Sequence, residues 1–238
     1  MNTRILLVGV LCVLVLTGRG QHSFLDDWKQ VKDTFGKEQL QISIINTLYS
    51  DYDKTSVVSE ETSVMQRSGD DLYYKVGTME IMFNKALMLV ANHEAKLIMI
   101  DKRNDQMLED YQKNYHDFVE QMSKQHREHN YNIETTRDDT YRKHTFNLTE
   151  GEFAQITYFF NIKSGKLAQI NYYYRNEQML ENIPSYSRPL LVVQFSINNT
   201  INPQWLNINR FGTLHKNKQF SPGATCASYH VLNHLKDY

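Results

Sequence analysis

The segment LYYKVGTMEIMFNKALMLVANHEAKLIMID, residues 72–101, constrains the fold more than any other part of the chain. Its side chains alternate as they do along β-strands, but large apolar residues occupy both phases of the alternation. One phase is expected to hold Leu72, Tyr74, Val76, Met79, Ile81 and Phe83, and the other Tyr73, Met82, Met88 and Met99. An antiparallel strand with one face in water alternates apolar with polar residues. Either both faces of these strands are covered, or one face is an apolar surface that receives a partner.

The N-terminus has the pattern of a secretory signal. A single basic residue, Arg4, precedes an apolar run over residues 5–16, and small residues follow it before Gln21. The run is shorter than the roughly 20 apolar residues that span a membrane, which disfavours a membrane anchor. We therefore expect residues 1–20 to be a signal peptide cleaved near Gly20, and residues 21–238 to form a single exported domain.

Charge and cysteine content exclude several classes of protein. Without Arg4 and Arg19 the chain has 24 basic and 27 acidic residues, a net charge of −3. Nucleic-acid binding requires a basic surface, so we expect no nucleic-acid partner. Cys12 lies in the signal, which leaves Cys226 without an intrachain disulfide partner. Small neighbours favour a buried, unreactive Cys226, and no cysteine at the cleavage junction marks the mature chain for lipid attachment, so we expect it to be soluble.

Helical and alternating patterns follow each other along the domain. Ser23 and Asp26 have the spacing of a capping box, which predicts a helix up to Phe35. Apolar residues at helical spacing predict a second, longer helix between Asn104 and His129. Alternation between turn residues predicts strands over 42–52, 56–67, 72–76, 78–84, 86–91, 95–100, 132–141, 143–148, 154–162, 166–175, 190–198 and 227–235.

Two helices beside so many strands predict an α+β fold. Large antiparallel sheets tend to curl, and two helices are too few to cover both faces of such a sheet. We expect a curved antiparallel sheet, an open half-barrel, with the helices packed on its concave face.

The sequence contains no strong catalytic or metal-binding motif. It lacks the Gly-x-Ser-x-Gly elbow and both kinds of glycine-rich phosphate loop. His126 and His129 are one helical turn apart, but His116 projects to another side and no further ligand completes a zinc site. His93 is expected in a solvated turn. We therefore expect no enzyme, no metal and no cofactor.

The unexplained feature is the excess of methionine and aromatic residues. An ordinary core accounts for most of them, but strands with both phases apolar are also what a lined cavity requires, since ligand pockets are mostly apolar. Methionine suits surfaces that accept varied apolar partners. The residues expected to line such a cavity are Tyr74, Val76, Met79, Ile81, Phe83 and Leu89, with Phe118 and Met122 from the long helix as a lid.

The order of signal, short helix, meander, long helix and further strands resembles that of the LolA/LolB-like lipoprotein carrier superfamily. The resemblance covers most of the mature chain and rests on the arrangement of GDDLYYKVGTMEIMFNKALMLVANHEAKLIMID and of the closing segment FSPGATCASYHVLNHL. It implies an open curved sheet with helices as a lid over an apolar cavity that holds lipoprotein acyl chains. No functional residue of the family can be matched by position in this sequence.

Two functions are expected from these observations. The first is a soluble, monomeric periplasmic carrier that binds acyl chains of lipoproteins or other lipids non-covalently, with a membrane donor or acceptor protein as a further partner. The alternative is an envelope interaction module that uses the same apolar face for another protein and has no lipid cargo. Mass spectrometry of the purified protein separates the two.

Overall fold

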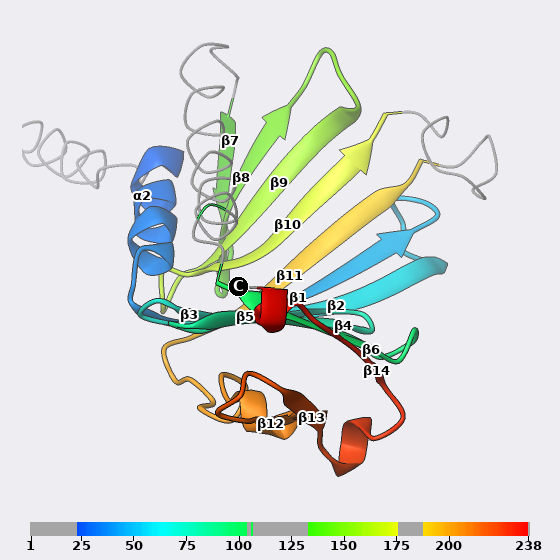
Figure 1. Cartoon of the computed structure of the whole chain (residues 1–238). Helices are drawn as coiled ribbons and strands as arrows, with labels where there is room; N and C mark the ends of the chain where they lie inside the picture. The colour runs from blue at the N-terminus through cyan, green and yellow to red at the C-terminus, as the bar shows by residue number, and fades with distance from the viewer. Residues whose placement is uncertain (1–22, 104–105, 107–132, 176–187, 238) are drawn as a thin grey trace, which may run out of the picture.

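A large curved sheet dominates the structure, a computed structural model that describes residues 23–103, 106, 133–175 and 188–237. The sheet curves strongly and does not close into a barrel (Figure 1). Its twelve strands lie in the order β14-β6-β5-β4-β3-β2-β1-β11-β10-β9-β8-β7. They are β1 (Gln39–Tyr49), β2 (Val57–Ser68), β3 (Asp71–Val76), β4 (Met79–Phe83), β5 (Leu87–Asn92), β6 (Leu97–Lys102), β7 (Ile133–Arg137), β8 (Tyr141–Asn147), β9 (Phe153–Asn161), β10 (Leu167–Tyr174), β11 (Leu190–Asn198) and β14 (His230–Asn233). The expected open half-barrel sheet is confirmed.

The sheet consists of two meanders joined in the middle. Strands β1 to β6 pair with their neighbours in chain order, and so do β7 to β11. The pairing of β1 with β11, from Gln41 opposite Asn198 to Tyr49 opposite Leu190, joins the two runs. All these pairs are antiparallel, whereas β14 lies parallel to β6. Gly77, with φ of +52°, forms the tight turn between β3 and β4, where a side chain would be strained.

Helix α2 (Phe24–Phe35) begins with the predicted capping box. The Ser23 hydroxyl accepts a hydrogen bond from the Asp26 backbone N–H at 3.2 Å, and the Asp26 carboxylate accepts one from the Ser23 N–H at 3.0 Å. The apolar stripe of the helix, Phe24, Trp28, Val31 and Phe35, is buried against the sheet. Figure 1 shows α2 on the inner side of the curve.

The strand register assigns every side chain to one of two faces, and we call the face that packs on α2 the concave face. Tyr74 pairs with Ile81 and with Met65 across β2, β3 and β4, so all three share this face. Met65 pairs in turn with Ile42 of β1, which packs in the same core as Trp28 of α2. The opposite, convex face receives the C-terminal part of the chain.

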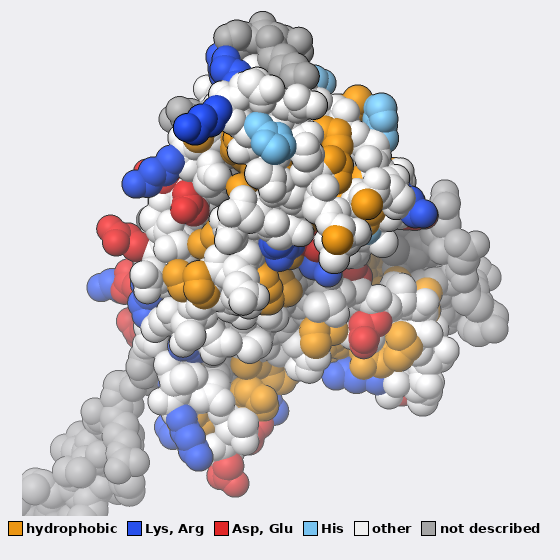
Figure 2. All heavy atoms as spheres, turned by 60° about the horizontal axis from the view of Figure 1, so that its bottom comes forward, with side chains coloured by type: hydrophobic (Ala, Val, Ile, Leu, Met, Phe, Trp, Pro, Cys, Tyr) orange, Lys and Arg blue, Asp and Glu red, His pale blue; other side chains and the backbone are white. Residues whose placement is uncertain are grey.

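The C-terminal segment packs on the convex face of β4, β5 and β6. It comprises 3-10 helices η2 (Ile208–Arg210), η3 (Ala224–Cys226) and η4 (His234–Asp237), the ribbon of β12 (Gly212–Leu214) and β13 (Phe220–Pro222), and strand β14. Phe211, Phe220 and Cys226 are buried against Leu89 and Ile98. Burial of Cys226 agrees with the expectation from its small neighbours. Figure 2 shows this side of the molecule, where apolar side chains form separate small patches.

Several sequence predictions require correction or lie outside the described residues. The sequence predicts two helices on the concave face, but α2 is the one α-helix in the described part of the chain. The predicted helix between Asn104 and His129 lies almost wholly outside the described residues, so a second helix on this face is not confirmed. The predicted strand over 132–141 ends at Arg137 instead. The Asp138 carboxylate accepts hydrogen bonds from the N–H groups of Thr140 and Tyr141 at 2.8 and 2.7 Å, which turns the chain into β8.

Candidate functional site

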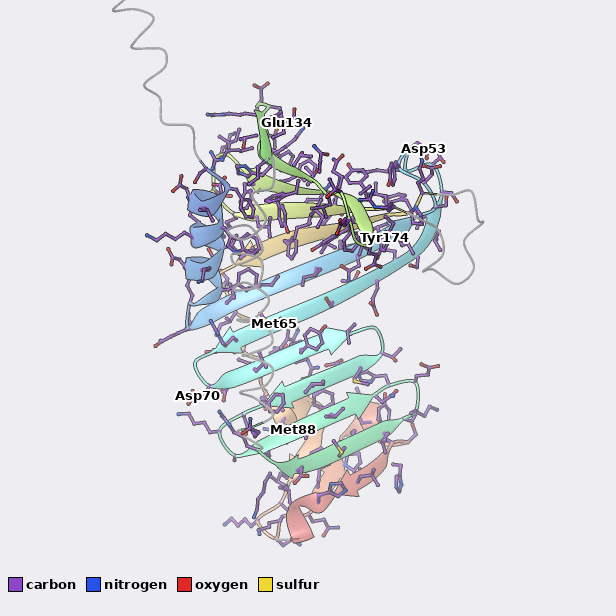
Figure 3. The ribbon with its side chains drawn as sticks, turned by 90° about the horizontal axis from the view of Figure 1, so that it is seen from above. Asp53, Met65, Asp70, Met88, Glu134 and Tyr174 are labelled. Carbon is purple, nitrogen blue, oxygen red and sulfur yellow. The ribbon has the colours of Figure 1, made fainter. Side chains whose placement is uncertain are left out.

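Apolar side chains occupy much of the concave face, although β2 contributes only Met65 beside Arg67, Ser63 and Glu61. The apolar residues of this face on β3 to β6 are Leu72, Tyr74, Val76, Met79, Ile81, Phe83, Met88, Val90, Leu97 and Met99, and those in the middle of the sheet are Ile44, Met65, Ile156, Tyr172, Val193 and Phe195. We call this set the concave apolar face. Figure 3 looks onto it, with Met65 and Met88 labelled on neighbouring parts.

Helix α2 covers one part of the concave face, and the apolar residues of that face form two clusters. The first contains α2 with Leu40, Ile42, Tyr158 and Phe160, and side chains such as Ile44 and Phe195 extend it as half-buried neighbours. The second contains Ile81, Phe83 and Met88, with Leu72, Tyr74, Val90 and Met99 packed against them. Both clusters lie on one side of one sheet, and Met65 of β2 connects them, because it packs against the first cluster and pairs with Tyr74 of the second.

Three of the expected lining residues, Tyr74, Ile81 and Phe83, belong to the second cluster. Val76 and Met79 pair with each other across the β3–β4 turn and point to the same face, where Met79 is 37% exposed. The structure therefore brings five of the eight expected residues together.

Leu89 does not share the concave face. It pairs with Met82 and Ile100 and is buried against Phe211 and Phe220 of the C-terminal segment, one residue out of phase with Val90, which pairs with Ile81. Phe118 and Met122 lie outside the described residues.

Met88 and Met99 also lie on the opposite face of the sheet from the one that the sequence predicts. Met88 pairs with Phe83 and Met99 pairs with Val90, which places both methionines on the concave face with Tyr74. The turn at residues 84–86 reverses the chain, so phase counted straight along the sequence does not carry over from β4 to β5. The pairing of strands across the turn shows that Met88, Val90 and Met99 lie on the concave face. The C-terminal segment covers the second apolar phase, which explains why both phases are apolar.

The concave face carries two uncharged tyrosines, Tyr172 on β10 and Tyr158 on β9. Burial, and secondly the neighbouring Tyr174, raise the pKa of Tyr172 to about 12, so its phenol stays neutral at physiological pH. Burial likewise raises the pKa of Tyr158 well above 10. Tyr158 is completely buried in the first cluster and Tyr172 packs half-buried against it, so both contribute aromatic area to the core beside α2.

A basic depression lies at one end of the strands beside the second cluster. It is open, has a volume of about 560 Å³, and is lined by Asp70, Lys85, Ala86, Lys102 and Arg103. The turns after β2 and β4 and the end of β6 meet there. The Arg103 guanidinium donates to the carbonyl oxygens of Asp70 and Asn84 at 3.3 Å each, which ties these turns together. Sequence reasoning missed this depression, although basic residues at two strand ends were a usable signal.

A buried polar cluster fixes α2 to the sheet. Asp27 of α2 is fully buried and accepts hydrogen bonds from His144 Nε2 at 2.8 Å and from Arg142 Nε at 2.6 Å. His144 Nδ1 lies 3.0 Å from the Thr135 hydroxyl. Burial raises the pKa of Asp27, but the hydrogen bonds from His144 and Arg142 and their charges outweigh it and leave the pKa lowered.

The hydroxyl of Thr135, the imidazole of His144 and the carboxylate of Asp27 follow one another in the order of an acyl-transfer triad. His144 and Asp27 are both completely buried, and Arg142 engages both oxygens of the carboxylate. A side chain that no substrate can approach has no use as a catalytic base. We therefore interpret this cluster as the attachment of α2, which places the helix on the concave face.

A second polar cluster attaches the C-terminal segment to the convex face, and it corrects the expectation for His93. Rather than lying in a solvated turn, His93 contacts Glu80 through Nε2 at 2.9 Å and the Tyr229 hydroxyl through Nδ1 at 2.7 Å. Burial, and secondly the charge of Lys75, lower the pKa of His93. Glu80 also pairs with Arg210 of η2 and accepts a hydrogen bond from the Tyr73 hydroxyl at 2.9 Å.

The described residues contain no group of three or more His, Cys, Asp or Glu side chains that could hold a metal ion. The three histidines considered for a zinc site, His116, His126 and His129, lie outside them. In the same part of the chain, no helix has both the length and the apolar character needed to cross a membrane.

Comparison with known proteins finds similarity in structure alone. No protein-family model matches the sequence, and no curated protein matches it. Solved structures that match include an uncharacterized conserved protein from Thermus thermophilus, with 8% identity and a TM-score of 0.37 over 82% of this chain and 96% of that one. They also include a LolA superfamily protein from Nitrosomonas europaea, with 8% identity and a TM-score of 0.27 over 76% and 94%.

An outer membrane lipoprotein-sorting protein domain from Vibrio parahaemolyticus matches with 8% identity and a TM-score of 0.25 over 78% of this chain and 96% of that one. The superfamily that the sequence resembles is thus named among the structural matches. Because these TM-scores are below 0.5, the ligand has to be inferred from the residues of this chain.

Proposed function

We propose that this chain is an exported, periplasmic carrier that binds an acyl chain of a lipoprotein or another lipid non-covalently on the concave apolar face. One observation supports this proposal most: apolar side chains follow one face of the sheet from Ile156 on β9 to Met99 on β6. These side chains extend beyond α2, the helix of the described residues that packs on this face.

The energetics suit transport without chemistry. Each methylene removed from water contributes about 0.8 kcal/mol, so an acyl chain leaves a membrane for water at a high cost. A protein surface that shields the chain lowers this cost, and release needs no bond to break. Met88 and Met99 suit such a surface, because flexible thioether side chains adapt to chains of different shape.

Displacement of the apolar fluorophore N-phenyl-1-naphthylamine by dodecanoate tests the proposal with single variants. Phe83→Asp should abolish binding, but Phe83 is only 1% exposed, so this variant needs a folding control by circular dichroism. Met79→Asp is the safer variant, since Met79 is 37% exposed. We expect it to weaken dodecanoate binding about tenfold, because it sets a charge on the apolar surface.

The matched control is Leu25→Asp on α2. Leu25 is 44% exposed and its side chain is outside the buried stripe of the helix, so the same change of chemistry should leave binding unaltered. Wild-type affinity in a folded Met79→Asp protein would remove the outer part of β4 from the site. Failure of the wild-type protein to bind fluorophore or dodecanoate, together with a copurifying protein, would instead favour the interaction module.

A further inference from the structure

We propose that residues 57–62 of β2 form a docking edge for an extended, basic segment of a partner protein, which adds to the sheet as a further strand. This inference goes beyond the proposed function, because it does not depend on whether the concave apolar face binds a lipid. It starts from a step in the sheet. Strand β2 has twelve residues and β3 only six, and their pairing ends with Ser63 opposite Val76, after which the chain turns at Gly77 into β4.

Residues 57–62 are therefore paired on one side only. They lie along β1, from Thr62 opposite Ile45 to Val57 opposite Tyr49, and no strand of the described residues lies along their other side. Figure 3 shows β2 extending toward Asp53 past the end of β3. Successive residues of an antiparallel strand direct their N–H and C=O groups to alternate sides, so about three of the six residues present both groups at the free edge. Such a row of groups can pair with an extended peptide.

The segment is accessible and already extended. All six of its residues are exposed, although β2 lies in the middle of the sheet. Val57 and Val58 are 56% and 42% exposed, and a register shift of the β1–β2 pairing places a bulge at Val58 near the outer end. Pairing with β1 holds the backbone in the strand conformation, so a further strand binds to it at little cost in conformational entropy.

Two adjacent glutamates determine the charge of this edge. Glu60 and Glu61 are the charged residues of the segment, and they point to opposite faces of the sheet because successive side chains of a strand alternate. The Thr47 hydroxyl donates to the Glu60 carboxylate at 3.3 Å, and the Glu61 carboxylate lies beside the turn at Gly77. Opposite charges on neighbouring strands stabilise a sheet. A partner strand with two consecutive basic residues would place one positive charge on each face.

The same charges disfavour a second copy of this chain as the occupant. Antiparallel pairing of two such segments about their centre would bring Ser59 of one copy opposite Glu60 of the other, with all four carboxylates close to one another. Like charges on neighbouring strands destabilise their pairing, and charged side chains are a common protection of free sheet edges. The edge therefore repels itself and attracts a basic segment.

NMR titration of the purified protein with the end-blocked hexapeptide TVKRVT tests the inference. The peptide has two central basic residues between β-branched ones, and its pattern is the same in both directions, so the test does not depend on strand direction. We expect it to bind at low ionic strength and to protect alternate backbone amides of residues 57–62 from hydrogen exchange, because main-chain hydrogen bonds form there. Salt should weaken the binding, and the acidic peptide TVEEVT should not bind.

Reversal of the charge provides the matched comparison. Glu60→Lys/Glu61→Lys should weaken the binding of TVKRVT at least about tenfold and allow TVEEVT to bind instead. The control is Glu134→Lys/Glu150→Lys, which makes the same change of charge at two exposed carboxylates, on β7 and between β8 and β9, and should leave the binding of TVKRVT unaltered. Circular dichroism checks that both variants fold.

Each other result rejects the inference. Binding of TVKRVT without protection of residues 57–62 would mean a contact between charges and no added strand. Binding that survives the reversal of Glu60 and Glu61 would place the peptide elsewhere, and no binding by the wild-type protein would reject a basic strand as the occupant. Dimerisation that protects the same amides would identify a second copy instead. None of these results alters the carrier proposal, which the displacement of the fluorophore by dodecanoate tests separately.

Discussion

Asp27 is the residue on which the position of α2 depends most. It is a fully buried carboxylate held by an arginine and a histidine from β8, so its charge is compensated only while the helix is docked. Removal of one member of a buried ion pair costs about 3 to 5 kcal/mol, because the remaining charges stay buried without compensation. The apolar stripe of α2 could be read from the sequence, but this anchor could not, because β8 lies more than 100 residues further along the chain.

Asp27→Asn should lower the free energy of unfolding at pH 7 by about 3 kcal/mol. Asp33→Asn, at an exposed position of the same helix, should change it by less than about 0.5 kcal/mol. Urea unfolding followed by circular dichroism measures both. Equal stability of the two variants would show that the Asp27 cluster does not hold the helix.

The same residue predicts an acid dependence with a definite sign. The folded pKa of Asp27 is lowered from its ordinary value of 3.8, so the stabilisation is fully present above pH 3.8 and is lost as the pH falls through the folded pKa. The difference in unfolding free energy between wild type and Asp27→Asn should therefore shrink below pH 3.8. A difference that grows with acid would contradict this assignment.

His93 gives an independent check on the convex face. Because burial and Lys75 lower its pKa below the ordinary 6.5, we expect the imidazole to be neutral at pH 7 and to titrate below pH 6.5. A histidine with a lowered folded pKa stabilises the fold above pH 6.5 and loses that contribution as the pH falls through the folded pKa. NMR titration of the His93 ring protons measures the midpoint, and a midpoint above 6.5 would contradict the buried contact.

Among the elements, the strands between residues 72 and 101 could be predicted best from the sequence. The face of the sheet to which each of their side chains points could be predicted least. Alternation and turn residues placed each of β3 to β6 within two residues of its observed bounds. Which face each residue points to depends on pairing across the turns, and this is why Leu89 was assigned to the wrong side and Met88 and Met99 were assigned to the opposite phase. The segment that covers the convex face of these strands is more than 100 residues away in the chain, so local sequence patterns cannot identify it.

A substitution at Gly212 tests how closely strands β12 and β13 of the C-terminal segment pack together. A methyl group at this position would lie 2.3 Å from the Ser221 carbonyl oxygen and 2.6 Å from the Phe220 ring, so the ribbon of β12 and β13 would have to move apart. Gly212→Ala should destabilise the protein by about 2 kcal/mol, within the range found for overpacking. Gly36→Ala is the control, since its nearest contact is 3.4 Å and its φ is −72°. Thermal unfolding compares them, and equal melting temperatures would refute the close packing of the ribbon.

At the scale of the whole molecule, the curved sheet has a cover on each face within the described residues. The C-terminal segment covers the convex face of β4 to β6, and α2 covers the concave face over the first core cluster. The apolar surface that continues beyond α2 to β3–β6 is the part of the molecule that the proposed function uses. Composition predicted that such a surface exists, whereas its position and the basic depression beside it depend on strand order and register.

The most direct test of the carrier proposal is native mass spectrometry of residues 21–238 purified from a bacterial periplasm, followed by solvent extraction of the same sample. The account predicts a near-stoichiometric adduct that dissociates on denaturation and is recovered as an acyl-containing species. Loss of the adduct in Met79→Asp and its retention in Leu25→Asp would place it on the concave apolar face. A mass equal to that of the polypeptide alone, in a protein that also fails to bind N-phenyl-1-naphthylamine, would contradict the account.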